Sequence, residues 1–169
     1  MRGISKVILK IIMNIDPHWI SGFVDGEGTF YVGINPHKTM KSGFQVLPEF
    51  RIVQHKKDIK LLYALKKYFK SGVVRVNHGD RYELRIRSIN ALKNIVIPFF
   101  EKNRLLTQKR YDFEKFRKVI FIIDKQEHLT KDGIEKIFKI IRSMNRAEKN
   151  ITRKHLDKNT VRSSLKNEA

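Results

Sequence analysis

The sequence predicts an α+β fold whose elements follow the order helix, two strands, helix, two strands, helices (αββαββα). Two separate stretches, 29–54 and 72–88, alternate between apolar and polar residues, and a turn-rich segment interrupts each of them once, as in a β-hairpin. An amphipathic stretch at 56–70 separates the two. We therefore expect one four-stranded antiparallel sheet, with helices covering one face and the other face left open.

The first helix and the first strand follow directly from local signals. Asp16 before Pro17 favours a helix start, because the acid caps free amides and proline suits the first helical position. We expect this helix to run to about Val24, where "DGEG" ends it. Residues 29–35 then alternate as a strand does. Its apolar side carries Phe30, Val32 and Ile34, and its other side carries Thr29, Tyr31, Gly33 and Asn35.

The second strand and the central helix come next. Residues 36–43 form a loop, and 44–54 read as a strand in which Pro48 indicates a bulge or an edge position, because proline cannot donate to a ladder. The stretch 56–70 is an amphipathic helix that ends before Gly72. Its apolar face is made of Ile59, Leu61, Leu62, Leu65, Tyr68 and Phe69.

The second hairpin spans 72–88, with its turn at "NHGD" (77–80). Its second arm has a clean apolar face, Tyr82, Leu84 and Ile86, opposite a charged one. Ser88 is a good cap for a short helix at 89–100. The remaining expected elements are a basic connection at 101–110, a helix at 111–123, and a helix at 131–145 that follows Thr130.

The length and the changes in composition predict the domain organisation. A chain of 169 residues is long enough for one domain with its own core. We place that domain at 16–145, after an N-terminal extension at 1–15 and before a polar, basic tail at 146–169.

The charge balance indicates a polyanionic partner. Thirty-six Lys and Arg residues against seventeen Asp and Glu give a formal charge of +19, far more than solubility requires. Nucleic acid is the favoured partner. A membrane surface is the alternative, but it would place the charge on one amphipathic helix, whereas here basic residues are spread over strands, loops and ends. We expect no membrane partner, because no apolar run is long enough to span one.

The absence of cysteine excludes a disulfide and a thiolate zinc site. The abundance of Lys, Ile and Asn suggests an AT-rich coding sequence. This suits an organelle (chloroplast or mitochondrion) or a bacterial cytoplasm, and the composition does not decide between them.

The open face of the expected sheet is rich in arginine. Such a surface is suited to the major groove of DNA, which admits a β-ribbon. Glu49 and Glu83 lie on the same face, so a solvated surface of mixed charge is the alternative, but the arginines outnumber these acids. The face carries Tyr31, Asn35, Arg51, Arg75, Asn77, Arg81, Arg85 and Arg87.

The stretch "WISGFVDGEGTFY" (19–31) places acids where a helix should stop. Asp25 and Glu27 would meet the negative end of the helix dipole, which is unfavourable unless a cation such as a divalent metal compensates. Gly22 and Gly26 leave a helix face that another backbone could approach. The simpler interpretation is a helix stop with acids in a turn, and the residues alone favour it.

This stretch also resembles the motif of the LAGLIDADG homing endonucleases, in the type with one motif per chain. "EFRIVQH" is similar to the second strand of that family, "VIPFFEKNRLLTQKRYDF" to its basic linker, and "EHLTKDGIEKIFKIIRSMN" to its C-terminal helix; together they cover about 16–145. Ile20 and Ser21 stand where the family usually has Leu and Ala, and Glu27 stands where it usually has Asp. A second copy of the motif is not found in the sequence.

The resemblance implies a homodimer that hydrolyses double-stranded DNA at a long, near-palindromic site with Mg²⁺, for which Mn²⁺ or Ca²⁺ could substitute in binding. It implies that Glu27 and the carbonyl of Gly26 hold the metal, that Gln54 positions water, and that Lys109 offsets phosphate charge. Gln108, Lys102 and Arg104 are alternatives to Lys109. The implied dimer interface comprises Gly22, Phe23, Asp25 and Gly26, with Asp25 bonding backbone amides of the partner helix.

The resemblance assigns the open face to DNA. The arginines would read guanines, Asn35 and Gln45 would read adenines, and Lys38, Lys41 and Lys56 would hold phosphates. An intron RNA maturase, a catalytically inactive DNA-binding protein of the same fold, and a ribosome-associated basic protein remain as alternative functions.

Overall fold

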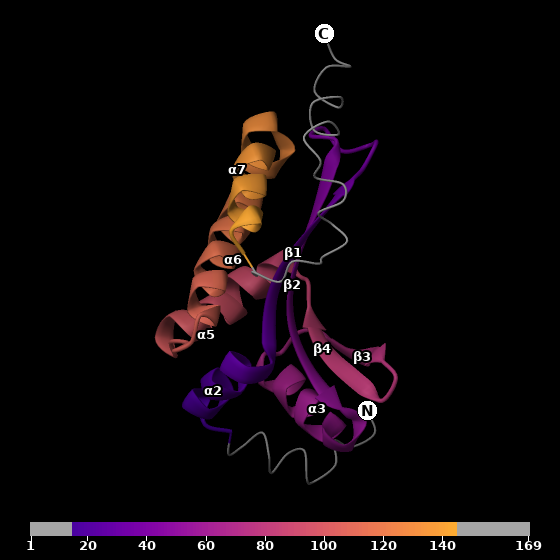
Figure 1. The fold of residues 1–169 in the computed structure, drawn as a ribbon, viewed down its shortest axis with the longest axis vertical. Coiled ribbons are helices and arrows are strands. Elements are labelled where there is room, and N and C mark those ends of the chain that lie inside the picture. The colour runs from indigo at the N-terminus through magenta and orange to yellow at the C-terminus, as the bar shows by residue number, and fades with distance from the viewer. Residues whose placement is uncertain (1–14, 145–169) are drawn as a thin grey trace.

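A computed structural model describes residues 15–144 of the chain. The extension and tail expected at 1–15 and 146–169 fall almost wholly outside the described residues, and so do their proposed boundaries. Within 15–144 the structure has the expected order of elements (Figure 1). The helices and strands of the αββαββ part are α2 (Pro17–Glu27), β1 (Gly28–Pro36), β2 (Phe44–His55), α3 (Ile59–Tyr68), β3 (Val73–His78) and β4 (Arg81–Ile86).

The later helices are more broken than the sequence predicts. The segment expected as one short helix at 89–100 consists of α4 (Ile89–Ala91), a π-helical turn (Leu92–Val96) and α5 (Ile97–Lys102). The turn comes just before Pro98, whose ring would collide with a carbonyl in a regular helix. The chain then continues into α6 (Lys109–Asp124) and α7 (Lys131–Arg142), and the side chain of Thr130, the residue expected to precede this helix, caps α7.

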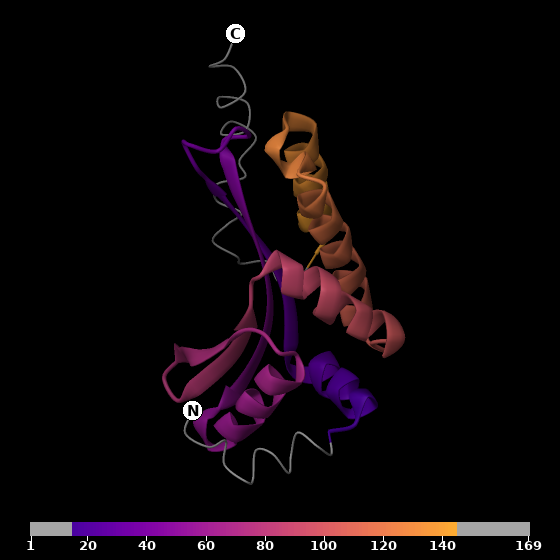
Figure 2. The same cartoon turned by 180° about the vertical axis from the view of Figure 1, so that it is seen from behind.

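The four strands form one antiparallel sheet in the order β1-β2-β4-β3. β4 pairs with β2 only from Phe50 to His55, so the first half of β2 has β1 as its sole neighbour. Pro48 lies in that half, which confirms the expected edge position. In Figures 1 and 2 the β1–β2 hairpin is long and curved, and its tip extends away from β3 and β4.

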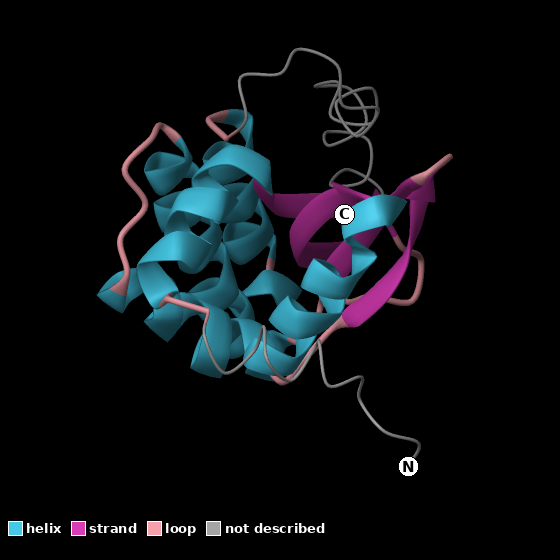
Figure 3. Cartoon of the chain, turned by 90° about the horizontal axis from the view of Figure 1, so that it is seen from below, coloured by secondary structure: helices cyan, strands magenta, loops and turns pink. Residues whose placement is uncertain are grey.

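One face of the sheet packs against the helices, most of which gather on one side of the strands in Figure 3. The ring of Phe30 on β1 is within 5.2–5.5 Å of the rings of Phe50, Phe100, Phe113 and Phe116, counted between ring centroids. This aromatic cluster joins the sheet to α5 and α6. The opposite face is left without helices along β4 and the facing part of β2, as predicted.

Candidate active site and nucleic-acid interface

α2 presents two different sides. Asp16 accepts hydrogen bonds from the amides of His18 and Trp19 and so starts the helix, as expected. Ile20 and Val24 are fully buried against the rest of the chain. The spacing i, i+3, i+4, i+7 then places a second stripe on the outer side, and this stripe is made of Trp19, Gly22, Phe23 and Gly26.

The outer stripe of α2 is apolar and open. The Trp19 and Phe23 rings stack with centroids 4.9 Å apart, and Trp19 is 46% exposed. A methyl group added at Gly22 or Gly26 would meet nothing within 4 Å. A second backbone could therefore approach α2 closely on this side.

The helix does not stop at Val24. It continues to Glu27, because the amide of Gly28 donates to the carbonyl oxygen of Val24 and completes another turn. Asp25 and Glu27 thus lie in the last turn of α2, at the negative end of its dipole, rather than in a loop beyond it.

Asp25 organises a loop of its own chain. Its carboxylate accepts from the amide of Leu106 at 2.7 Å, and from the hydroxyl and amide of Thr107 at 2.8 and 3.3 Å. These contacts come from the α5–α6 connection of the same chain, which folds back onto α2, and the expected bond of Asp25 to amides of a partner helix stays a prediction. The hydroxyl of Thr107 in turn accepts from the Lys109 amide at 3.2 Å.

Lys109 supplies the cation that the end of α2 requires. Its Nζ donates to the carbonyl oxygens of Val24 at 2.9 Å and Gly26 at 3.1 Å. Burial lowers the pKa of Lys109, and the nearby Asp25, Glu27 and Asp112 carboxylates act in the opposite direction. The C-terminal carbonyls of α2 therefore already bind a positive charge.

Glu27 is the acid at the end of α2 whose carboxylate is not engaged by another described residue. Its side chain is exposed, and among residues 15–144 no hydrogen bond or ion pair holds its carboxylate. The same residues contain no cluster of three or more His, Cys, Asp or Glu side chains that could hold a metal ion. One chain thus offers one free carboxylate beside the carbonyl of Gly26.

Gln54 lies near the same end of the sheet. Gly28 pairs with Ile52, so Gln54 is two residues past the last pair of the β1–β2 ladder. Alternation along β2 places its side chain on the side of Ile52 and away from Arg51. Its proposed contact with water stays a prediction.

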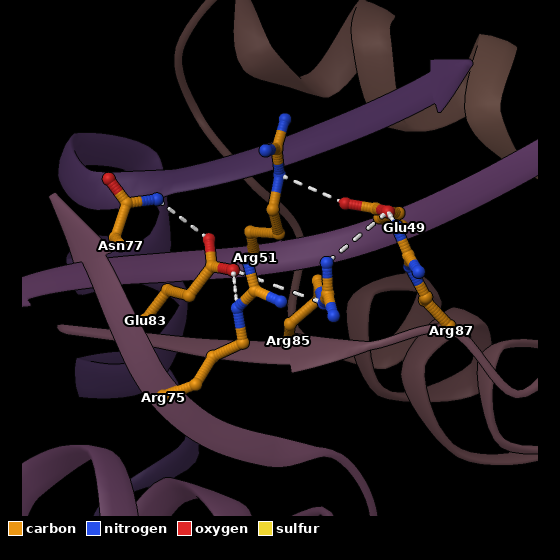
Figure 4. A network of polar contacts seen from close by, with 7 residues as sticks. All are labelled: Glu49, Arg51, Arg75, Asn77, Glu83, Arg85 and Arg87. Carbon is orange, nitrogen blue, oxygen red and sulfur yellow. Dashed lines mark hydrogen bonds and ion pairs between the residues drawn. The ribbon is translucent and has the colours of Figure 1, made fainter.

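The open face of the sheet carries a network of charges (Figure 4). Glu49 and Glu83 are 4% and 2% exposed, because arginine side chains cover them. The sequence placed both acids on this face but did not indicate that they would be buried. The network comprises Glu49, Arg51, Arg75, Asn77, Glu83, Arg85 and Arg87.

The other expected DNA contacts lie around this network. The guanidinium of Arg51 lies 4.7 Å from the centre of the Tyr31 ring. Asn35 and Gln45 are directly opposite each other near the hairpin tip. The exposed residues Lys38 and Lys41 lie in the hairpin loop, Arg81 is exposed on β4, and Lys56 forms an exposed ion pair with Asp80 at 2.8 Å.

The family follows from comparison with known proteins. Residues 20–120 match the model of the LAGLIDADG endonuclease family, and the chain belongs to this family of homing endonucleases. A probable intron-encoded endonuclease of Neurospora crassa is 33% identical over 78% of the chain, which covers 29% of that protein. The chain therefore spans less than a third of that curated relative.

Two solved structures are similar in fold. The crystal structure of the homing endonuclease I-TnaI is 55% identical with a TM-score of 0.79, over 85% of this chain and 97% of the other. The structure of the LAGLIDADG homing endonuclease I-SmaMI bound to cleaved DNA is 33% identical with a TM-score of 0.80, over 85% of this chain and 48% of the other. A further I-SmaMI structure holds an uncleaved DNA target in the presence of calcium ions.

A membrane span is not found in the described part of the chain, where every helix is too short or too polar to cross a bilayer.

Proposed function

We propose that the protein is a site-specific, Mg²⁺-dependent homing endonuclease that cleaves both strands of DNA at a long, near-palindromic site as a homodimer. The observation that carries the proposal is the exposed Glu27 carboxylate in the last turn of α2, where Lys109 binds the C-terminal carbonyls, in a chain whose open sheet face carries arginines. Membership of the LAGLIDADG family supports the same reaction class.

The residues at the end of α2 fit a divalent metal. Carboxylate and backbone carbonyl oxygens are the ligands that Mg²⁺ prefers, and the Gly26 carbonyl, which accepts one hydrogen bond from Lys109, keeps a second lone pair. Glu27 and the Gly26 carbonyl would hold the ion, with DNA phosphate and a second protomer supplying further oxygens. A bound Mg²⁺ would lower the pKa of water and neutralise charge on the phosphate.

The protein groups have separate tasks in this proposal. Lys109 brings positive charge to the phosphate as negative charge develops there. Asp25 positions Lys109 through Thr107, because the Asp25 carboxylate holds the Thr107 hydroxyl and that hydroxyl holds the Lys109 amide. Gln54 would orient the attacking water by a hydrogen bond.

The homodimer is proposed from the open stripe of α2. A stacked Trp19–Phe23 pair beside two glycines is an apolar surface with room for a second helix. Crossing two copies of α2 there would bring two Glu27 carboxylates together, one for each strand of the duplex. The nearly complete match to the I-TnaI chain supports a unit of this size.

The DNA contacts are proposed on the same grounds. A β-ribbon fits the major groove, and the arginines of the open face are suited to guanine, whose O6 and N7 accept two hydrogen bonds. Asn35 and Gln45 would read adenine, and Lys38, Lys41 and Lys56 would contact phosphates. The similarity to an intron-encoded endonuclease supports the proposal that an intron encodes this protein. We further propose that this intron belongs to an organelle genome.

The direct test is selection of cleaved sites from a randomised duplex library in Mg²⁺, with Glu27→Gln as the inactive control. We expect one long, near-palindromic site to be enriched by the wild type and none by the variant. Binding of intron RNA without any DNA cleavage would instead support a maturase. Enrichment of bound but uncut sites would support an inactive DNA-binding protein.

A further inference from the structure

Two acids on the surface proposed to meet DNA are almost fully buried. A carboxylate facing an anionic ligand is unfavourable, and a buried carboxylate is unfavourable unless it is paired. Glu49 and Glu83 are nevertheless 4% and 2% exposed, and each is paired with at least two arginines. We therefore look for the role of these two acids in their contacts with the surrounding arginines.

Glu83 on β4 anchors the arm formed by β3. Its Oε1 lies 3.0 Å from Nε of Arg75, the residue directly opposite it in the β3–β4 ladder. Its Oε2 accepts a hydrogen bond from the side-chain amide (Nδ2) of Asn77 at 2.8 Å. Both carboxylate oxygens are thus engaged by residues that the sequence assigns to DNA.

Glu49 on β2 anchors the other part of the face. It accepts a hydrogen bond from Nε of Arg87, and its Oε2 lies 3.5 Å from Nε of Arg51. Arg85 lies between the two acids, with nitrogens 3.9 Å from Glu49 and 3.9 Å from Glu83. Arg85 therefore couples the two halves of the network.

The network places two positively charged side chains directly opposite each other on neighbouring strands. Arg51 and Arg85 are direct partners in the β2–β4 ladder, where two like charges repel. The buried acids offset this repulsion, and they also restrict the guanidinium groups to a small range of positions. Ordering a long side chain before binding removes an entropic cost that would otherwise fall on the complex.

The guanidinium groups of the network retain positive charge and N–H donors that the two glutamates do not use. Four arginines face two glutamates here, so the network retains a net positive charge. The Nε atoms of Arg51 and Arg85 are buried, so only the terminal N–H donors of these two guanidinium groups are left to contact a base. The acids thus position the arginines without satisfying all of their donors.

We propose that Glu49 and Glu83 are positioning residues for sequence recognition, which fix the arginines of the open face so that their remaining donors meet guanine O6 and N7. The proposal rests on the proposed DNA-binding function. The two acids affect different base pairs of each half-site. Glu83 affects the base pairs contacted by Arg75 and Asn77, and Glu49 affects those contacted by Arg51 and Arg87. The position under Arg85 depends on both acids.

The test measures the affinity of each variant for the selected target and for every single-base substitution of it, in Ca²⁺ to prevent cleavage. We expect Glu83→Gln and Glu49→Gln each to reduce discrimination by about tenfold at its own guanine positions, which is within the range of one bidentate contact. The two sets should overlap at one position. Glu101→Gln is the matched control, because it removes an acid paired with Arg117 at 2.5 Å on the helical side.

Each alternative has its own signature. If the acids merely repel phosphate, both Gln variants bind all sequences more tightly with unchanged discrimination. If they merely support the fold, all affinities fall by one factor together with the melting temperature. Either result overturns the proposal. A wild type that does not discriminate between sequences overturns the proposed function itself.

Glu83→Asp separates charge from position. It keeps the carboxylate but withdraws it by one methylene from Arg75 and Asn77. We expect the same loss of discrimination as in Glu83→Gln, with the wild-type dependence of affinity on salt. This variant also decides the matter if Glu83→Gln fails to fold. Wild-type discrimination in Glu83→Asp would contradict a positioning role.

Discussion

The two acidic positions that matter here, the end of α2 and the open face of the sheet, are built in opposite ways. Glu27 is exposed and has no ion pair or hydrogen bond among residues 15–144, whereas Glu49 and Glu83 are buried under arginines of the same chain. The difference separates two tasks. We propose that the end of α2 is left open for a metal and a second protomer, and that the sheet face is arranged before DNA binds.

The physical cost of each acid explains the contrast. A buried carboxylate without partners costs several kcal/mol, so Glu49 and Glu83 require their arginines for folding. The exposed carboxylate of Glu27 stays hydrated and needs no partner. Its position at the negative end of α2 is offset by the ammonium of Lys109, which binds the carbonyls of Val24 and Gly26.

The largest expected effect is the separation of cutting from binding by Glu27→Gln. The substitution keeps size but removes the charge proposed to hold Mg²⁺, so cleavage should fall by about a thousandfold or more. Affinity for the target should stay within a few fold, because the sheet face is unchanged. Paired gel-shift and cleavage assays on one duplex measure both. Glu135→Gln, an exposed acid on α7, is the control, and near-wild-type cutting by Glu27→Gln would remove Glu27 from the site.

Gly22→Leu should abolish double-strand cleavage in a folded chain. A Cβ added at this position meets nothing within 4 Å in one protomer, but a leucine side chain would keep a second α2 at a distance. Leucine also favours a helix over glycine, so the single chain should stay folded.

Lys60→Leu places the same side chain on an exposed site of α3 and should leave cleavage intact. A fully active Gly22→Leu variant would show that α2 does not form the interface.

Binding should weaken steeply with salt. With about ten phosphate contacts, the logarithm of affinity should fall with the logarithm of salt concentration with a slope of about −9. The excess of Lys and Arg over Asp and Glu motivates this expectation. Filter binding between about 50 and 200 mM salt measures the slope. A slope near zero would mean that the basic residues serve another partner.

Asp25→Ala should loosen the loop that carries Lys109. It removes three hydrogen bonds from Leu106 and Thr107, and the loss of stability should be about 1–3 kcal/mol. Cleavage should drop more than DNA binding, because Lys109 loses its anchor. Thermal unfolding and cleavage rates check this, and Asp25→Asn, which keeps one acceptor, should be intermediate. Equal losses of binding and cleavage would contradict the assignment.

The smallest effect concerns a region remote from both sites. Burial lowers the pKa of His128, so the unfolded chain binds more protons than the folded chain below about pH 6.5. The contribution of His128 to stability therefore falls as the pH decreases through that value. His128→Leu should flatten the pH dependence of the melting temperature without changing DNA recognition at neutral pH. An unchanged pH dependence would show that the histidine does not titrate with unfolding.

Periodic features were predictable from the sequence, and contacts between distant segments were not. The strands, both hairpins and the Asp16 and Ser88 caps follow from local patterns, and the structure confirms them. The bonds from Asp25 to a loop some 80 residues later have no local signal. The same holds for Lys109 on the α2 carbonyls, where the sequence suggested a divalent metal as the compensating cation and assigned Lys109 to the phosphate.

The burial of Glu49 and Glu83 was also not predictable from the sequence, but for a different reason. Alternation correctly assigned both acids to the open face, and an open face is expected to be hydrated. Only the ladder register shows that Arg75 lies opposite Glu83, and that Arg51 and Arg85 lie side by side. Sequence periodicity gives the face of a residue but not its partner across the strands.

The most direct test of the contrast between the open end of α2 and the sheet face is the number of protein chains bound to one target duplex. Native mass spectrometry in Ca²⁺ measures this number, and addition of Mg²⁺ then shows which strands are cut. If the end of α2 is half of a site, two chains should occupy one duplex, and both strands should be cut. A complex of one chain and one duplex that still cuts both strands would contradict the account.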